Sequence, residues 1–282
     1  MTDQYAVIGN PVEHSLSPAI HAEFARATGQ DISYGRLLAP LDRFSTVVLK
    51  FRDEGGKGLN VTLPFKQEAW RLADFHSPGA GAAGAVNTLA FADGRIAGHN
   101  TDGTGLMRDL KDNQGCAVRG KRVLLMGAGG AVFGVMEPLL RELPQEVVVA
   151  NRTLDKAVAL VGHFDKLQKF AAHGVIARPY GALAGLRFDI VVNATSAGLA
   201  DVMPPLPRAI FAPGALAYEM VYGRNTLFMG FATECGARAV DGLGMLVEQA
   251  AESFFIWRGV RPATKPVIER LRQEGGGRRA EG

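Results

Sequence analysis

The sequence has little cysteine and no long apolar segment. Its 282 residues include two cysteines, Cys116 and Cys235, which are far apart and match no Cys-x-x-Cys or Cys/His spacing. Neither a disulfide framework nor a metal site is therefore expected. No apolar run is long enough to span a bilayer, and the start MTDQYAVIG lacks the basic and apolar regions of an export signal. We expect a cytoplasmic protein without a membrane partner.

An excess of one charge is also lacking. The 31 basic and 28 acidic residues are scattered along the chain and leave a formal net charge of +3. This distribution argues against a nucleic-acid-binding surface. The length and the 47% hydrophobic content suffice for a large core and favour two domains over one.

Strand and helix patterns alternate along the chain, which predicts an α/β fold with mainly parallel sheets. A first series begins at YAVIG, and a second begins at KRVLLMGAGG and continues to ARAVDG. We predict a substrate-binding domain over 1–104, a nucleotide-binding domain over 105–239, and a C-terminal segment over 240–282. The helix LGMLVEQAAESFFIW is expected to pack back on the first domain, and the tail QEGGGRRAEG has the composition of a disordered segment.

Two segments of the first domain carry reactive side chains. An Asp-Gly turn at 93–94 predicts a hairpin whose register points Asn87 and Asp102 together. In GLNVTLPFK, Asn60 and Thr62 alternate onto one face, and Lys66 follows in the next helix. If these faces meet, the group suits polyol recognition with proton transfer. The alternative for Lys66 is a solvated surface lysine.

The second domain opens with a glycine-rich turn. GAGGAVFG directly follows a buried strand, so Gly127 and Gly129 fit a tight turn against a pyrophosphate at a helix N-terminus. Val132 replaces the last glycine of the usual pattern, and an ordinary strand-to-helix turn is the alternative. The next strand ends in Asn151-Arg152-Thr153 instead of the acid that binds the NAD ribose. If a helix starts here, Arg152 and Lys156 share a face that suits a 2′-phosphate.

The segment HSLSP has two interpretations. Ser17 could cap the helix that Pro18 opens, with Ser15 a loop hydroxyl. The two hydroxyls could instead bind a carboxylate beside the helix N-terminus. No GxSxG elbow accompanies His14, so a serine hydrolase is not expected.

Eight motifs together resemble one family. HSLSP, NVTLPFK, AVNT, NTDG, GAGGA, NRT, NATSAG and GMLVEQAAESF occur in this order along nearly the whole chain, which in this respect resembles the shikimate dehydrogenases. The resemblance implies a catalytic domain, a Rossmann-type NADP-binding domain and an active cleft between them. It further implies reduction of 3-dehydroshikimate to shikimate with NADPH, in aromatic amino-acid biosynthesis.

The resemblance also implies roles for individual residues. Lys66 and Asp102 match catalytic positions. The positions that match substrate-binding residues are Ser15, Ser17, Asn60, Thr62, Asn87, Tyr222 and Gln249. The positions that match cofactor-binding residues are Gly127, Ala128, Gly129, Gly130, Ala131, Asn151, Arg152, Thr153, Lys156, Thr195, Ser196, Met220, Gly242 and Met245.

Several positions depart from the family pattern. Phe133 replaces a common basic residue, Pro138 is expected to interrupt its helix, and Glu219 replaces a common aspartate. The alternatives are a quinate or aminoshikimate dehydrogenase and a non-catalytic NADP-sensing module. A glutamyl-tRNA reductase-like activity would need a reactive cysteine in the substrate domain. A monomer and a homodimer are both compatible with the sequence.

Overall fold

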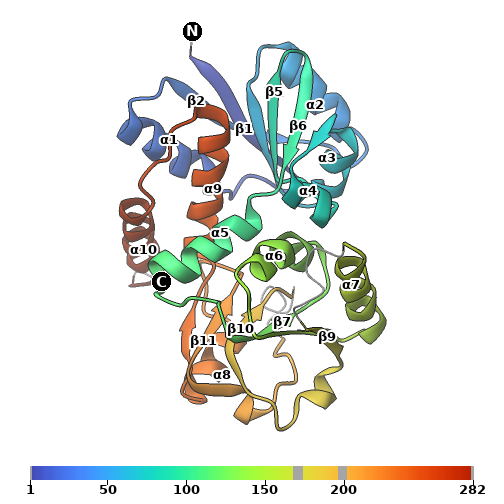
Figure 1. Cartoon of the computed structure of the whole chain (residues 1–282). Helices are drawn as coiled ribbons and strands as arrows, with labels where there is room; N and C mark the ends of the chain where they lie inside the picture. Colours follow the sequence, from blue (N-terminus) through green and yellow to red (C-terminus); the bar gives the residue numbers. More distant parts are fainter. Residues whose placement is uncertain (1, 168–173, 196–201, 281–282) are drawn as a thin grey trace. The chain divides into compact units, whose positions relative to one another are not determined.

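The chain forms two compact units. In the computed structural model, residues 2–167, 174–195 and 202–280 are described, the last six of them by backbone alone. Unit 1 comprises Met1–Gly105 and Leu246–Gly282, and unit 2 comprises Leu106–Met245 (Figure 1).

Unit 1 contains a mixed six-stranded sheet in the order β2-β1-β3-β5-β6-β4. β1 is parallel to β2 and β3, and β4 is parallel to β6, whereas β5 is antiparallel to β3 and β6, so the sheet is mainly parallel, as expected. The strands are β1 (Asp3–Gly9), β2 (Ile32–Leu38), β3 (Gly58–Val61), β4 (Phe75–His76), β5 (Thr88–Ala92) and β6 (Arg95–His99). The helices are α1 (Ser17–Thr28), α2 (Phe44–Asp53), α3 (Lys66–Leu72), α4 (Pro78–Ala83), α5 (Asp102–Arg108), α9 (Leu243–Arg258) and α10 (Lys265–Ala280), of which α5 and α9 cross the boundary between the units.

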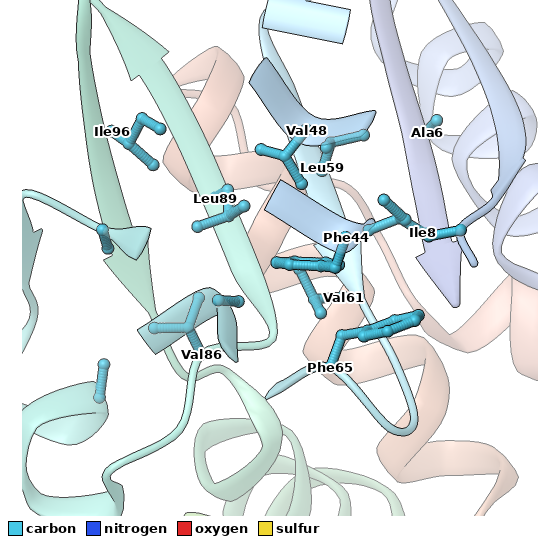
Figure 2. Packing of buried hydrophobic residues seen from close by; sticks show 14 residues of the cluster. Ala6, Ile8, Phe44, Val48, Leu59, Val61, Phe65, Val86, Leu89 and Ile96 are labelled. Atoms are coloured by element: carbon cyan, nitrogen blue, oxygen red, sulfur yellow. The ribbon is translucent and has the colours of Figure 1, made fainter. Parts of the chain in front are cut away.

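One face of this sheet forms the apolar core of unit 1. Along each strand the side chains point to the two faces of the sheet in turn, so every second side chain points toward α2 and α3. Figure 2 shows the resulting cluster, which includes Ala6, Ile8, Phe44, Val48, Leu59, Val61, Phe65, Val86, Leu89 and Ile96.

The opposite face of the sheet is covered by α1 and α9 (Figure 1). A Cβ on Gly58 of β3 would lie 2.4 Å from the indole Nε1 of Trp257, so only glycine lets this α9 side chain pack so closely. The same indole nitrogen donates a hydrogen bond to the main-chain oxygen of Leu89 at 3.0 Å. Polar residues of β3 and β5 therefore face a buried layer instead of solvent.

Unit 2 contains a six-stranded sheet in the order β12-β11-β10-β7-β8-β9, with every pair parallel. The strands are β7 (Arg122–Met126), β8 (Glu146–Ala150), β9 (Val175–Arg178), β10 (Phe188–Asn193), β11 (Phe211–Glu219) and β12 (Arg238–Val240). The helices are η1 (Asp109–Asn113), α6 (Gly130–Arg141), α7 (Leu154–Lys166), η2 (Tyr180–Leu183), η4 (Arg208–Ile210) and α8 (Leu227–Glu234). The strand order reverses between β7 and β10, and such a switch point at the carboxyl ends of strands is where Rossmann-type sheets bind ligands.

Two local expectations differ from the structure. Helix α6 continues through Pro138, because a proline in the last turn removes one hydrogen bond while the apolar face of the helix stays buried. Helix α10 extends to Ala280, whereas the composition of the tail indicates disorder. The short strand β4 and the helix α4 were not predicted. Ser77 caps α4 by accepting a hydrogen bond from the Ala80 amide at 3.3 Å.

Candidate active site

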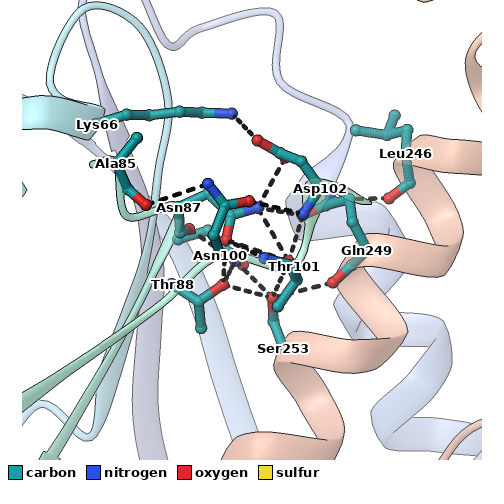
Figure 3. Close-up of polar contacts among 11 residues, drawn as sticks. Lys66, Ala85, Asn87, Thr88, Asn100, Thr101, Asp102, Leu246, Gln249 and Ser253 are labelled. Carbon is teal, nitrogen blue, oxygen red and sulfur yellow. Dashed lines mark hydrogen bonds and ion pairs between the residues drawn. The ribbon is translucent and has the colours of Figure 1, made fainter. Parts of the chain in front are cut away.

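Lys66 and Asp102 form an ion pair in unit 1. Lys66 is the first residue of α3, Asp102 is the first residue of α5, and Lys66 Nζ lies 2.5 Å from Asp102 Oδ2 (Figure 3). The side chains are 28% and 11% exposed. The interpretation of Lys66 as a solvated surface lysine is therefore wrong. The geometry holds an ammonium group in place while leaving it accessible.

The β5–β6 hairpin brings Asn87 to the same carboxylate. Ala92 pairs with Arg95 around the Asp-Gly turn, as predicted. Asn87 Nδ2 donates to Asp102 Oδ1 at 2.8 Å, which confirms that these two side chains point together. The Asn87 amide oxygen accepts from the main-chain amide of Thr101 at 2.9 Å.

Gln249 joins this cluster from α9. Its Oε1 lies 3.4 Å from Asn87 Nδ2, and its Nε2 donates to the main-chain oxygen of Leu246 at 2.8 Å (Figure 3). The part of α9 that belongs to unit 1 therefore places a side-chain amide beside the ion pair.

Asn60 lies deeper than the sequence indicates. Its Oδ1 accepts from the Tyr34 hydroxyl at 2.7 Å, and its Nδ2 lies 2.9 Å from Ser253 Oγ and 3.2 Å from Thr88 Oγ1. With 6% exposure, Asn60 lies in the layer between the sheet and α9. Thr62 follows the end of β3 and is half-buried.

Sequence reasoning missed three hydroxyl groups beside this cluster. Thr88 neighbours Asn87, Thr101 neighbours Asp102, and Ser253 follows Gln249 by one helical turn. All three side chains are buried and hydrogen-bonded. The i, i+4 spacing, which puts Gln249 and Ser253 on one face of α9, was the available signal.

The N-terminus of α1 differs from the capping interpretation of Ser17. Helix α1 begins at Ser17 with Leu16 as its N-cap, so Ser17 is not the cap. Ser15 Oγ instead accepts from the Ser17 amide at 3.3 Å. Burial raises the pKa of Tyr34 well above its ordinary value, and a hydrogen bond from Ser17 opposes this effect. Arg36 donates to the main-chain oxygen of Ser15 at 2.7 Å.

In unit 2, the glycine-rich turn has a conformation and a close contact that require glycine. Gly127 has φ +110°, and a Cβ there would lie 3.1 Å from the main-chain oxygen of Ala194. Gly129 is the N-cap of α6, and both Gly129 and Gly130 are exposed. Ala128 precedes the two glycines, Ala131 lies in the first turn of α6, and both are half-buried. An exposed helix N-terminus after such a turn fits a pyrophosphate group.

The basic segment after β8 differs from the expected helical face. Helix α7 begins at Leu154 with Thr153 as its N-cap, so Arg152 precedes the helix and helical spacing does not relate it to Lys156. Asn151 Nδ2 donates to the main-chain oxygen of Thr153 at 2.8 Å and shapes the turn. Both cationic side chains are exposed and available to an anion.

Thr195 is held by a buried carboxylate network. Its Oγ1 donates to Asn193 Oδ1 at 2.7 Å, and Asn193 Nδ2 donates to Glu219 Oε2 at the same distance. Glu219 is fully buried, and its Oε1 accepts from the Val221 amide at 3.1 Å. Burial raises the pKa of Glu219, while these hydrogen bonds oppose the rise. Ser196 lies outside the described residues.

Met220 and Gly242 are packed directly together. A Cβ on Gly242 would lie 2.2 Å from the main-chain oxygen of Met220, so glycine is required for this contact. Met245 is buried two residues into α9. Tyr222 follows in the loop after β11, where burial raises the pKa of its hydroxyl.

Phe133 has a structural explanation. Its ring centroid lies 5.5 Å from that of His163 and 6.0 Å from that of Phe164. The side chain therefore joins α6 to α7 where a basic residue was expected.

Comparisons with known proteins agree with this geometry. Three family models match: "Shikimate dehydrogenase substrate binding domain" over residues 7–89, "Shikimate / quinate 5-dehydrogenase" over 109–200, and "Shikimate 5'-dehydrogenase C-terminal domain" over 242–272. The shikimate dehydrogenase (NADP(+)) of Alkalilimnicola ehrlichii is 57% identical over 97% of this chain and 100% of its own length.

Solved structures give the same result. The crystal structure of an Ael1 enzyme from Pseudomonas putida has a TM-score of 0.90 and 50% identity, and the match covers 95% of this chain and 98% of that chain. Shikimate 5-dehydrogenase from Thermus thermophilus, solved with shikimate, has a TM-score of 0.84 and 35% identity over 97% and 99% of the two chains. From the identity with these relatives, which extends over nearly their full length, the chain belongs to the shikimate dehydrogenase family.

Proposed function

We propose that the chain catalyses the reversible NADP-dependent interconversion of 3-dehydroshikimate and shikimate. The observation that carries the proposal is the Lys66–Asp102 pair, with Asn87 donating to the second carboxylate oxygen. A positioned ammonium and carboxylate provide proton transfer to a carbonyl oxygen, and the described part of the chain holds no cluster of potential metal ligands.

Each substrate group has a partner in this proposal. Lys66 donates the proton to the C3 ketone oxygen and, in the reverse direction, its neutral amine accepts the proton of the hydroxyl. Asp102 orients Lys66 and accepts from the C4 hydroxyl. Further ring hydroxyls and the carboxylate are bound by Asn60, Thr62, Asn87, Tyr222, Gln249, Ser15 and Ser17.

The nucleotide fits the residues of unit 2. The Gly127–Ala131 turn holds the pyrophosphate at the start of α6, and Arg152 with Lys156 binds the 2′-phosphate by charge-assisted hydrogen bonds. Asn151 and Thr153 shape that turn, and the nicotinamide side is formed by Thr195, Ser196, Met220, Gly242 and Met245. When bound, NADPH supplies the hydride.

The cysteines and the helices bear on the cellular compartment. Cys116 and Cys235 are free thiols, which fits a reducing cytoplasm. None of the helices among the described residues is long and apolar enough to cross a membrane. We propose a cytoplasmic enzyme that acts as a monomer or a homodimer.

The test is a matrix of two substrates and two cofactors. The purified chain is mixed with shikimate or quinate and with NADP or NAD, and formation of reduced nicotinamide is followed by its absorbance. We expect the highest kcat/KM with shikimate and NADP. A preference for quinate or NAD would contradict the proposal, and NADP binding without any turnover would identify a sensing module.

A further inference from the structure

A series of amide and hydroxyl groups connects β2 with the ion pair inside unit 1. The Tyr34 hydroxyl donates to Asn60 Oδ1 at 2.7 Å, and Asn60 Nδ2 donates to Ser253 Oγ at 2.9 Å. Ser253 Oγ lies 2.8 Å from Thr88 Oγ1, which lies 3.0 Å from Asn87 Oδ1 (Figure 3). These hydrogen bonds therefore form a continuous chain from β2 through β3 and α9 to the start of β5.

Hydrogen counting gives this series a direction. A hydroxyl has one hydrogen, and an amide oxygen only accepts, so Thr88 donates to Asn87 Oδ1. Ser253 then supplies the hydrogen in its contact with Thr88 Oγ1 and shares this one hydrogen with the main-chain oxygen of Gln249. Ser253 Oγ lies 3.0 Å from that main-chain oxygen.

The series ends at the Asp102 carboxylate. With its oxygen held by the Thr88 hydroxyl and the Thr101 amide, the Asn87 side chain turns Nδ2 toward Asp102 Oδ1. The reversed amide would place its oxygen against the carboxylate, which is repulsive. The other carboxylate oxygen remains paired with Lys66.

We propose that Thr88 and Ser253 are positioning residues for the reaction. They hold the Asn87 amide in one orientation, and Asn87 in turn orients Asp102 and Lys66. Thr88 and Ser253 are both 0% exposed, so water does not replace a lost partner, and removing the Thr88 hydroxyl leaves the Asn87 amide oxygen held by Thr101 alone. The inference rests on the proposed function, because it assigns the ion pair to catalysis.

The test is a double-mutant cycle on the full-length chain. Thr88→Val keeps the side-chain shape and removes the hydroxyl, and we expect kcat with shikimate to fall roughly 3- to 10-fold, as for one buried hydrogen bond. The KM for NADP should not change. Thr88→Ser restores the hydroxyl and should recover kcat to within about twofold. In an Asn87→Ala background, Thr88→Val should have almost no further effect, since Thr88 acts through Asn87.

Two further variants keep the test decisive. Ser253→Ala should lower kcat in the same way and also lose its effect in the Asn87→Ala background. Thr28→Val removes a hydroxyl of α1 that donates to Phe24 outside this series, and it should leave kcat unchanged. Equal losses of kcat with and without Asn87, or no recovery with Thr88→Ser at an unchanged Tm, would overturn the inference. If Lys66→Met keeps full activity, the proposed function itself fails, and the two failures are thus distinguished.

Discussion

The substrate side in unit 1 and the cofactor side in unit 2 are built in different ways. In unit 1, Lys66, Asn87 and Asp102 are oriented by other side chains in a largely buried network. In unit 2, a backbone turn and the exposed side chains Arg152 and Lys156 face solvent. A ring with several hydroxyls needs directional partners, whereas phosphates are recognised by charge and backbone amides. The effects of combined substitutions on kcat and KM should therefore be non-additive in the unit 1 network and nearly additive among the exposed residues of unit 2.

The largest expected effect comes from removing the proposed proton donor. Lys66→Met should lower kcat by about 10² to 10⁴, because general acid–base catalysis contributes about that much. Shikimate binding and the KM for NADP should change little. Steady-state kinetics of this variant are compared with Lys57→Met, which changes an exposed lysine outside the cluster. An unchanged kcat for Lys66→Met would remove Lys66 from the mechanism.

A smaller effect is expected at the start of α1. Changing both Ser15 and Ser17 to alanine should weaken shikimate binding by about 1 to 3 kcal/mol for each charge-assisted hydrogen bond lost. The KM for NADP should stay constant. The methyl ester of shikimate, which lacks the charge, should be affected less than shikimate. If the KM values for both compounds stay unchanged, the serines only shape the turn.

On the cofactor side, a substitution should change cofactor binding without changing the rate of the chemical step. The double change Asn151→Asp and Arg152→Ala should raise the KM for NADP roughly 10- to 100-fold, since each phosphate contact contributes about 1.5 to 3 kcal/mol. The kcat at saturating cofactor should be nearly unchanged. Values of kcat/KM for NADP and NAD are measured at fixed ionic strength, because salt screens exposed contacts. A variant that retains the native NADP preference would show that this turn does not bind the 2′-phosphate.

The smallest effect concerns the stability of the buried layer in unit 1. His21 is fully buried and stacks on Tyr34 with ring centroids 4.2 Å apart, and burial lowers its pKa from 6.5 to about 3. Below the unfolded pKa the unfolded state binds a proton that the folded state does not. The free energy of unfolding should therefore fall as the pH decreases from about 6 to about 5, by about 1.2 kcal/mol from this group.

Replacing His21 with phenylalanine should remove this part of the pH dependence. Urea unfolding of native protein, His21→Phe and the exposed-site control His76→Gln is followed at both pH values. The control should retain the native slope with pH. A native slope in His21→Phe would mean that other groups cause the acid sensitivity.

Local patterns predicted much of the candidate site because short-range geometry determines it. The two-residue turn sets the hairpin register, which pairs Thr88 with His99 and so brings Asn87 close to the start of α5, where Asp102 lies. The sequence predicted the glycine-rich turn before α6 equally well, because Gly127 needs a positive φ whatever surrounds it. The burial of Asn60 could not be predicted from the sequence, since a polar residue at this strand position can face either a binding site or an interior layer.

The amino-acid sequence by itself determined the alternation of strands and helices, the hairpin register and the glycine positions, because each depends on neighbouring residues. Tertiary structure alone decided that Lys66 meets Asp102, 36 positions later, and that Asn60 contacts Ser253, 193 positions later. It also decided that Phe133 joins two helices. Contacts of this kind depend on how α9 and the strands pack, and packing is a property of the whole core that no local pattern encodes.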